Sequence, residues 1–135
     1  MDHLSQTQRD ELRQALLDER ARVGTRIDAD AAAAAPNHDI GDIQDGAAEQ
    51  MRRRQALDRS ARDVSRVDEI EAALRRMEDG SYGICEETGE AIPFGRLKLQ
   101  PTTRYTVEAL ELLESERARE RLTGDTSADE DGTAY

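Results

Sequence analysis

Residues 82–93, YGICEETGEAIP, have the layout of the first half of a zinc knuckle: a cysteine, a turn glycine and a short apolar return. The usual spacing would put a second cysteine at Thr88 and another pair roughly 15–20 residues further on. Those later positions fall near Thr106 and Ala109. A structural zinc site needs four ligands, and neither a threonine hydroxyl nor an alanine methyl group serves as one. We therefore expect that this knuckle, with Cys85 as its sole cysteine, binds no zinc.

Something other than a metal ion must then stabilise the knuckle. Apolar side chains in and after it are candidates for a small core, and burying each contributes on the order of 1.5–3 kcal/mol. They are Tyr82, Ile84, Ile92, Phe94, Leu97, Leu99, Tyr105 and Val107. Cys85 is expected to be a small buried hydrophobic residue. The alternative is a redox-sensing thiol, which Glu86 and Glu87 disfavour because adjacent acids would raise its pKa.

Two long helices are predicted before the knuckle. The first spans residues 5–34, with Ser5 as a candidate N-cap and with Pro36 stopping it. Its apolar stripe consists of Leu12, Leu16, Val23 and Ile27. The second begins near Asp42 and ends near Asp79, where Gly80 is placed as a C-terminal cap. Its stripe consists of Ile43, Ala47, Met51, Leu57, Ala61, Val64, Val67, Leu74 and Met77.

A short turn between such helices forces them to run antiparallel. At about 1.5 Å per residue, the hairpin would be roughly 45–55 Å long. The predicted fold is mainly α, with a long antiparallel coiled-coil hairpin over residues 1–80 whose tip lies near 36–46. Residues 81–122 form a small metal-free, zinc-finger-like module with a C-terminal helix, expected from Thr103 to about Leu122. Residues 123–135 are expected to be a disordered acidic tail.

The composition disfavours several classes of function. The 135 residues carry 19 basic and 30 acidic side chains, a net charge of −11, whereas direct DNA binding requires Lys and Arg to neutralise phosphates. No apolar run approaches the roughly 20 residues of a membrane span, and the N-terminus lacks a signal-peptide pattern. Without a nucleophile–base pair, a phosphate loop or a metal-ligand set, we expect neither an enzyme nor a resident cofactor. A cytoplasmic, monomeric, protein-binding chain is predicted.

Residues 82–109 resemble the DksA/TraR family of bacterial transcription regulators. The family signature YGxCxxCGxxIxxxRLxxxPxxxxCxxC is matched by YGICEETGEAIPFGRLKLQPTTRYTVEA. The chain retains Tyr82, Gly83, Cys85, Gly89, Ile92, Arg96, Leu97 and Pro101. It departs from the signature at Thr88, Thr106 and Ala109, the places of the other three cysteines, which makes it a member with a degenerate zinc finger.

The hairpin turn carries a second match to the family. The family's tip motif, Asp-x-x-Asp-x-Ala, fits residues 42–47, DIQDGA. The resemblance implies that the hairpin enters the secondary channel of bacterial RNA polymerase, with Asp42, Asp45 and Ala47 near the active site. It also implies altered transcription initiation, often together with guanosine tetraphosphate in the stringent response. The alternative is structural: Asp42 as an N-cap, Asp45 as a first-turn acid and Ala47 as seam packing.

Arginines cluster on the second predicted helix. The candidates for contact with acidic polymerase surfaces are Arg52, Arg53, Arg59 and Arg62. The alternative is a solvated helix face whose arginines pair within the hairpin, because the first helix is rich in acids.

The response to guanosine tetraphosphate is expected to be weak. In the family it uses basic residues near the junction of hairpin and knuckle, and the aligned positions here are Glu69, Gln100 and Leu110. Binding a tetraphosphate needs cations, and a glutamate repels it. Two other functions stay open: a coiled-coil adaptor, and a decayed paralogue that binds protein without regulating polymerase.

Overall fold

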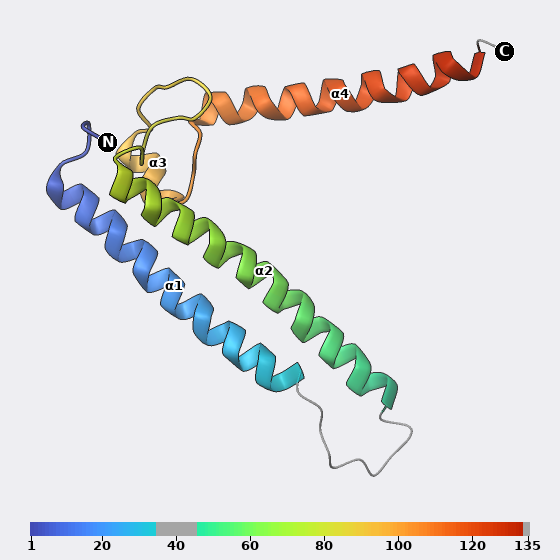
Figure 1. The fold of residues 1–135 in the computed structure, drawn as a ribbon, viewed down its shortest axis with the longest axis horizontal. Helices are drawn as coiled ribbons and strands as arrows, with labels where there is room; N and C mark the ends of the chain where they lie inside the picture. The colour runs from blue at the N-terminus through green and yellow to red at the C-terminus, as the bar shows by residue number, and fades with distance from the viewer. Residues whose placement is uncertain (35–45, 134–135) are drawn as a thin grey trace.

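The computed structural model describes residues 1–34 and 46–133, with side chains described as far as residue 124. Its helices are α1 (Gln6–Ala34), α2 (Gly46–Asp79), α3 (Phe94–Leu99) and α4 (Val107–Thr133). Figure 1 shows α1 and α2 side by side as an antiparallel hairpin, with α3 and its loops gathered at one end. In the described part the only extended pairing is an isolated bridge between Ile84 and Ala91. The predicted helical hairpin with a small module is confirmed.

The start of α1 follows the predicted capping chemistry. The Gln8 N–H donates to Ser5 Oγ at 3.1 Å, and the Ser5 N–H donates to Gln8 Oε1 at 2.9 Å. This reciprocal pair is a capping box, which satisfies two backbone donors that the helix itself leaves unpaired. The predicted stripe of α1 is also correct, since Leu12, Leu16 and Val23 are buried.

The predicted stripe of α2 is wrong in its distal half. From 49 to 63 the buried or half-buried positions are Glu49, Arg53, Ala56, Ser60 and Asp63. Their alternating steps of four and three are the repeat of a coiled-coil seam, and most of these side chains are polar.

The apolar residues of this half lie outside that seam. Met51, Leu57 and Val64 are 60%, 59% and 46% exposed, and Ala47 and Ala61 are exposed as well. The same repeat continues into the predicted apolar positions Val67, Leu74 and Met77, so the proximal half was predicted correctly. Ile43 lies outside the described residues.

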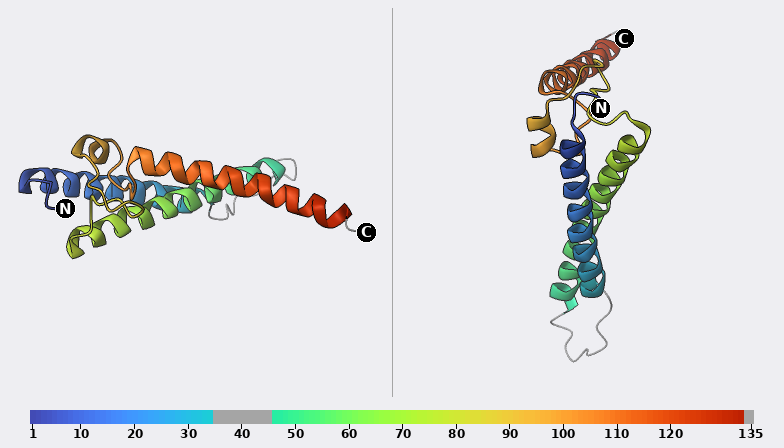
Figure 2. Two further views of the ribbon diagram at one scale, coloured as in Figure 1. Left: turned by 90° about the horizontal axis from the view of Figure 1, so that it is seen from above. Right: turned by 90° about the vertical axis from the view of Figure 1, so that its left-hand side faces the viewer.

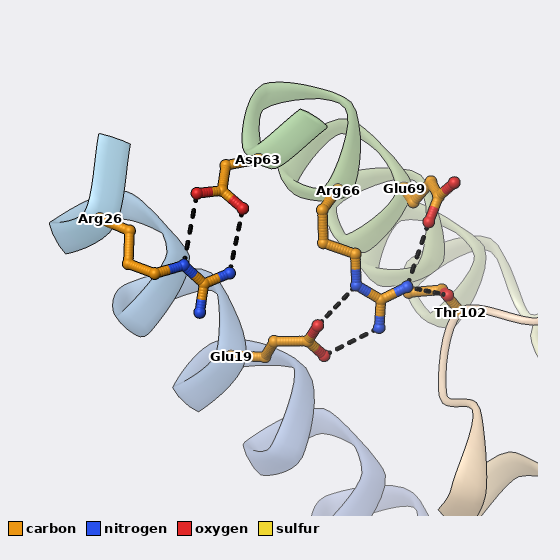
Figure 3. Close-up of polar contacts among 6 residues, drawn as sticks. All are labelled: Glu19, Arg26, Asp63, Arg66, Glu69 and Thr102. Carbon is orange, nitrogen blue, oxygen red and sulfur yellow. Dashed lines mark hydrogen bonds and ion pairs between the residues drawn. The ribbon is translucent and has the colours of Figure 1, made fainter. Parts of the chain in front are cut away.

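Ion pairs between the helices accompany the polar seam (Figure 3). Arg26 and Asp63 approach to 3.0 Å, Arg59 and Asp30 to 3.3 Å, and Arg66 pairs with Glu19. The hydrogen bond from Arg26 holds the pKa of Asp63 below its ordinary value. Such exposed pairs add little stability, but they match complementary charges across the hairpin and so favour one register.

The core lies at the base of the hairpin, where both long helices meet the knuckle. It consists of Leu4, Leu12, Leu16, Ile70, Ala73, Met77, Tyr82, Cys85, Ile92, Leu97 and Ala109. This cluster joins the hairpin, the knuckle and the first turn of α4 into one unit. The knuckle therefore packs directly against the base of the hairpin.

Some of the predicted knuckle core residues lie elsewhere. Tyr82, Ile92 and Leu97 are fully buried as predicted, and Phe94 and Tyr105 pack at the edge of the core. Ile84 is half-buried, whereas Leu99 is 85% exposed and Val107 45% exposed. The predictions for Leu99 and Val107 were wrong because residues two apart on a helix point about 200° apart, and Leu97 and Ala109 take the inward positions.

The N-terminal residues close the knuckle, which the sequence did not suggest. Leu4 is 2% exposed within the core, and His3 Nε2 lies 2.8 Å from the Ile92 carbonyl oxygen. A Cβ at Gly83 would lie 3.2 Å from His3 Cε1, and Gly83 has φ +78°. Glycine suits this position both for its left-handed backbone and for the space that His3 occupies.

The last helix differs from its prediction at both ends. It begins at Val107 rather than Thr103, and it runs to Thr133 instead of ending near Leu122 before a disordered tail. Gly124 costs a helix only about 1 kcal/mol, and no proline stands between 107 and 133 to end it. Figure 1 shows α4 extending away from the hairpin, and the right-hand view of Figure 2 shows it beyond the end of the hairpin that carries the knuckle. No helix in the described part is both long and apolar enough to cross a membrane.

Candidate functional site

The knuckle keeps the backbone of a metal-binding turn. The Cys85 N–H donates to the Glu90 carbonyl at 2.8 Å, and the Gly89 N–H donates to the Cys85 carbonyl at 2.9 Å. Gly89 has φ +74°, a conformation that glycine adopts without strain. The Ile92 N–H donates to the Gly83 carbonyl at 2.7 Å, which closes the short apolar return predicted from the sequence.

The four positions of the zinc signature carry a different set of contacts. The Thr106 hydroxyl lies 3.9 Å from Cys85 Sγ and accepts the Ala109 N–H at 3.2 Å. Thr106 thus caps the start of α4, as threonine does at many helix N-termini. The Thr88 hydroxyl accepts the Glu90 N–H at 3.3 Å. Ala109 is fully buried, so its methyl group packs in the core.

This donor set does not fit zinc. It offers one thiol, two hydroxyls that already serve in hydrogen bonds, and a methyl group, whereas structural zinc takes four thiolate or imidazole ligands. Within residues 1–34 and 46–133, no group of three or more His, Cys, Asp or Glu side chains is arranged to hold a metal ion. Hydrogen bonds and apolar packing are the contacts that the structure shows at the four positions of the zinc signature.

The Cys85 thiol is buried, with 1% of the residue exposed. Burial raises its pKa, while hydrogen bonds from the Thr88 hydroxyl and the N–H groups of Thr106, Thr88 and Glu87 lower it, with a net result of about 7. The prediction that Glu86 and Glu87 would raise this pKa was wrong, because both residues are exposed and the hydrogen bonds, that of the Thr88 hydroxyl foremost, together outweigh the effect of burial. Burial, rather than a high pKa, is the feature of this site that disfavours reaction of the thiol.

The candidate tip residues lie at or beyond the edge of the described chain. Asp42 and Asp45 fall outside the described residues. Ala47 is the second residue of α2 and is exposed, so the prediction that it also packs in the seam does not hold. α2 begins at the end of the hairpin furthest from the knuckle (Figure 1).

The candidate arginines fall into two groups. Arg52 pairs with Glu49 at 2.7 Å, Arg53 lies 3.9 Å from the same carboxylate, and Arg59 pairs with Asp30. These three arginines thus pair within the hairpin, as the structural alternative expects, and their role as polymerase contacts stays a prediction. Arg62 is exposed and makes no ion pair among the described residues, so it keeps its charge available to a partner.

The three positions aligned with the family's alarmone-responsive residues do come together. Glu69, Gln100 and Leu110 line one groove of about 790 Å³ where the hairpin, the loop after α3 and α4 meet. Arg76 and Arg104 also line it. Arg76 donates to the Thr102 carbonyl at 3.2 Å, and Arg104 lies 3.4 Å from the Glu86 carboxylate. Two cations of the groove are thus engaged within the molecule, whereas Arg75, which also lines it, is exposed and makes no ion pair among the described residues.

Comparison with known proteins agrees with this architecture. Residues 80–114 match the family described as the prokaryotic dksA/traR C4-type zinc finger. The solved structure of transcription factor DksA2 from Pseudomonas aeruginosa superposes with a TM-score of 0.78 at 32% identity, covering 84% of this chain and 88% of that one. The chain belongs to the DksA/TraR family. Its one cysteine distinguishes it from the four-cysteine pattern for which the family's zinc finger is described.

Two further relatives show how much of this chain the similarity covers and how high the sequence identity is. The RNA polymerase-binding transcription factor DksA of Caulobacter vibrioides is 46% identical over 91 residues, which are 66% of this chain and 59% of the relative. The chain thus spans less than two thirds of that relative's length. A Chlamydia trachomatis protein, titled an RNA polymerase binding protein and transcriptional regulator, has the same fold with a TM-score of 0.50 at 22% identity. These relatives are named as transcription factors or regulators, not as enzymes.

Proposed function

We propose that this chain is a DksA-like regulator that binds bacterial RNA polymerase through the secondary channel and alters initiation through the acidic tip of its hairpin. The observation that carries the proposal is the match to DksA2 over 88% of that structure at a TM-score of 0.78. The chain also keeps the family's tip motif at residues 42–47. At about 1.5 Å per residue, the 34 residues of α2 give the hairpin a length of roughly 50 Å. A rod of two helices of this length is slender enough to enter a channel.

The regulator acts without zinc. Tyr82, Ile92, Leu97 and Leu4 supply a continuous core for the knuckle, and Thr106 supplies the cap that starts α4. A knuckle that depends on bound metal loses its fold when the metal is removed. This knuckle has no such dependence, so its activity persists in zinc-poor or oxidising conditions.

The alarmone contributes little to this chain's action. The groove lined by Glu69, Gln100 and Leu110 also contains Asp68, Asp79 and Glu86. Its acids thus outnumber its arginines, Arg75, Arg76 and Arg104, and the last two bond to groups of the protein. A tetraphosphate would meet acids where it requires cations.

A coiled-coil adaptor is the second candidate, and one observation favours it. Met51, Leu57 and Val64 expose apolar side chains on α2, and exposed apolar surface marks a site of protein contact where it is contiguous. Under the polymerase proposal these side chains contact the channel wall. Under the adaptor alternative they bind another helix, and the tip acids are dispensable.

The proposal predicts a transcriptional effect that survives zinc chelation. In a purified transcription assay at a promoter with a short-lived open complex, the wild-type chain changes transcript yield equally with and without a chelator, because no ligand is removed. A four-cysteine family member treated identically serves as the matched control and loses its effect. Adding guanosine tetraphosphate changes the yield no more than it does with polymerase alone. Absence of any effect on transcription, or its loss in chelator, contradicts the proposal.

A further inference from the structure

Arg66 connects three separate segments at the junction of hairpin and knuckle (Figure 3). Its Nη2 donates to Glu19 Oε2 on α1 at 2.9 Å, and its Nε donates to the other oxygen of the same carboxylate. Its Nη1 donates to Glu69 Oε2 at 3.1 Å and to the Thr102 hydroxyl at 2.8 Å. One guanidinium therefore binds α1, its own helix α2 and the loop that follows α3.

The loop that Arg66 reaches leads directly into α4. Pro101 and Thr102 are held through their carbonyls by Tyr82 Oη at 2.7 Å and Arg76 Nη2 at 3.2 Å. Thr106, four residues after Thr102, caps α4. A displacement of this loop therefore moves the start of the last helix.

Few contacts of α4 itself fix its direction. Leu110 and Leu113 are half-buried, and just before the helix the Glu86 N–H donates to the Arg104 carbonyl at 2.9 Å. Ala109 is the one residue of α4 in the buried core, and beyond the first turns α4 extends away from the hairpin in Figure 1. A helix anchored only at its first turns pivots about that end unless the segment before it is fixed. Arg66 is the side chain that ties this segment to both helices of the hairpin.

The chemistry requires arginine. The guanidinium donates from Nε, Nη1 and Nη2 in a fixed planar arrangement, and a bidentate pair with a carboxylate adds directional specificity. A lysine ammonium is a point charge that cannot reproduce both the bidentate pair with Glu19 and the bond to Thr102. The side chains of Arg66 and Glu19 are 31% and 24% exposed, so solvent competes only partly.

We propose that Arg66 is the positioning residue that fixes the direction of α4 relative to the hairpin. It does so by binding Glu19 on α1 and the Thr102 hydroxyl at the same time. A partner that engages the hairpin and α4 together would then meet both at a set angle. The proposal concerns the free protein and does not depend on what the partner is.

Distance measurements by pulsed electron paramagnetic resonance test this role. Azide-bearing residues placed at Gln55 on α2 and Glu116 on α4, both exposed, take an alkyne spin label and leave Cys85 unmodified. Arg66→Leu is expected to make the 55–116 distance distribution at least about twice as wide as in the wild type, because the local restraint is lost. Arg66→Lys widens it less but does not restore the wild-type width.

Two controls separate positioning from general loosening. A second label pair at Asp28 on α1 and Gln55 stays narrow in every variant if the hairpin itself is intact. Thr102→Val removes the hydroxyl acceptor and keeps the side-chain shape, so it should widen the 55–116 distribution without disturbing Glu19, even if Arg66→Leu proves unstable. An unchanged 55–116 width in Thr102→Val, or equal widening of both label pairs in Arg66→Leu, overturns the proposal.

Discussion

Replacing Leu97 with alanine is expected to lower the free energy of unfolding by about 2–5 kcal/mol, the usual cost of truncating a buried leucine. Leu97 is fully buried among core residues contributed by the hairpin and the knuckle. The cost is large for this protein because the core of the described residues is a single small cluster, and because a donor set that does not fit zinc offers the knuckle no metal clip when packing is lost. Urea unfolding followed by circular dichroism measures it.

Leu99 provides a matched control two residues away on the same short helix. It is 85% exposed, so Leu99→Ala should change the free energy of unfolding by less than about 0.5 kcal/mol. Adding zinc should rescue neither variant. Equal effects at the two leucines, or a Leu97→Ala variant restored by zinc, would mean that the knuckle is held together by something other than this core.

Replacing Asp45 with asparagine should abolish most of the transcriptional effect, by on the order of tenfold or more, while leaving folding and polymerase binding in place. The substitution removes one negative charge and keeps the size of the side chain. In a site that excludes water, such a charge acts strongly on nearby metal and nucleotide. Asp42→Asn is expected to act in the same direction. The measurement compares transcript yield with polymerase affinity for each variant.

Asp28 supplies the matched control for the tip. It lies exposed on α1 and makes no ion pair among the described residues, so Asp28→Asn makes the same chemical change elsewhere on the hairpin and should behave as wild type. The adaptor alternative makes the opposite prediction. Under it, Asp45→Asn keeps full activity, while Leu57→Ser, at an exposed position, abolishes it.

Local sequence patterns predicted where helices begin and where the chain turns, because caps and turn glycines act on the backbone within a few residues. Ser5 begins α1 with a capping box, and Gly83 and Gly89 stand where the backbone has positive φ. The base of the hairpin was also predictable, since Leu12, Leu16 and Met77 are apolar at seam positions. These features need no knowledge of what packs against them beyond an adjacent apolar face.

The distal seam was not predictable from hydrophobicity because its members are polar. Asp63 faces the partner helix and pairs with Arg26, while the more hydrophobic Leu57 and Val64 remain exposed. Here the face turned inward is the one whose charges complement those of α1. That information lies in the other helix and not in the periodicity of α2. A search for opposite charges in matching seam positions of both helices would have found it.

The knuckle shows the same division between local and distant information. Loss of its zinc ligands was readable at Thr88, Thr106 and Ala109, since each residue type excludes ligation. The contacts of Leu4 and His3 with the knuckle could not be predicted from the sequence. They join residues about 90 positions apart in the chain, and no shared motif links the two segments. The hydrogen bond from Arg66 to Thr102 was not predictable either, because these residues are also distant in the chain.

Photo-crosslinking from the distal end of the hairpin tests the central claim most directly. In one variant a benzophenone amino acid replaces Ala48, which is exposed in the first turn of α2. In the control variant it replaces Glu90, on the exposed knuckle loop. Each variant is mixed with polymerase and irradiated. The account predicts that Ala48 crosslinks to polymerase residues lining the secondary channel near the active site, in chelator as in buffer, and that Glu90 does not. Crosslinks from Ala48 to the outer surface of the polymerase, or none at all while Glu90 reacts, would contradict it.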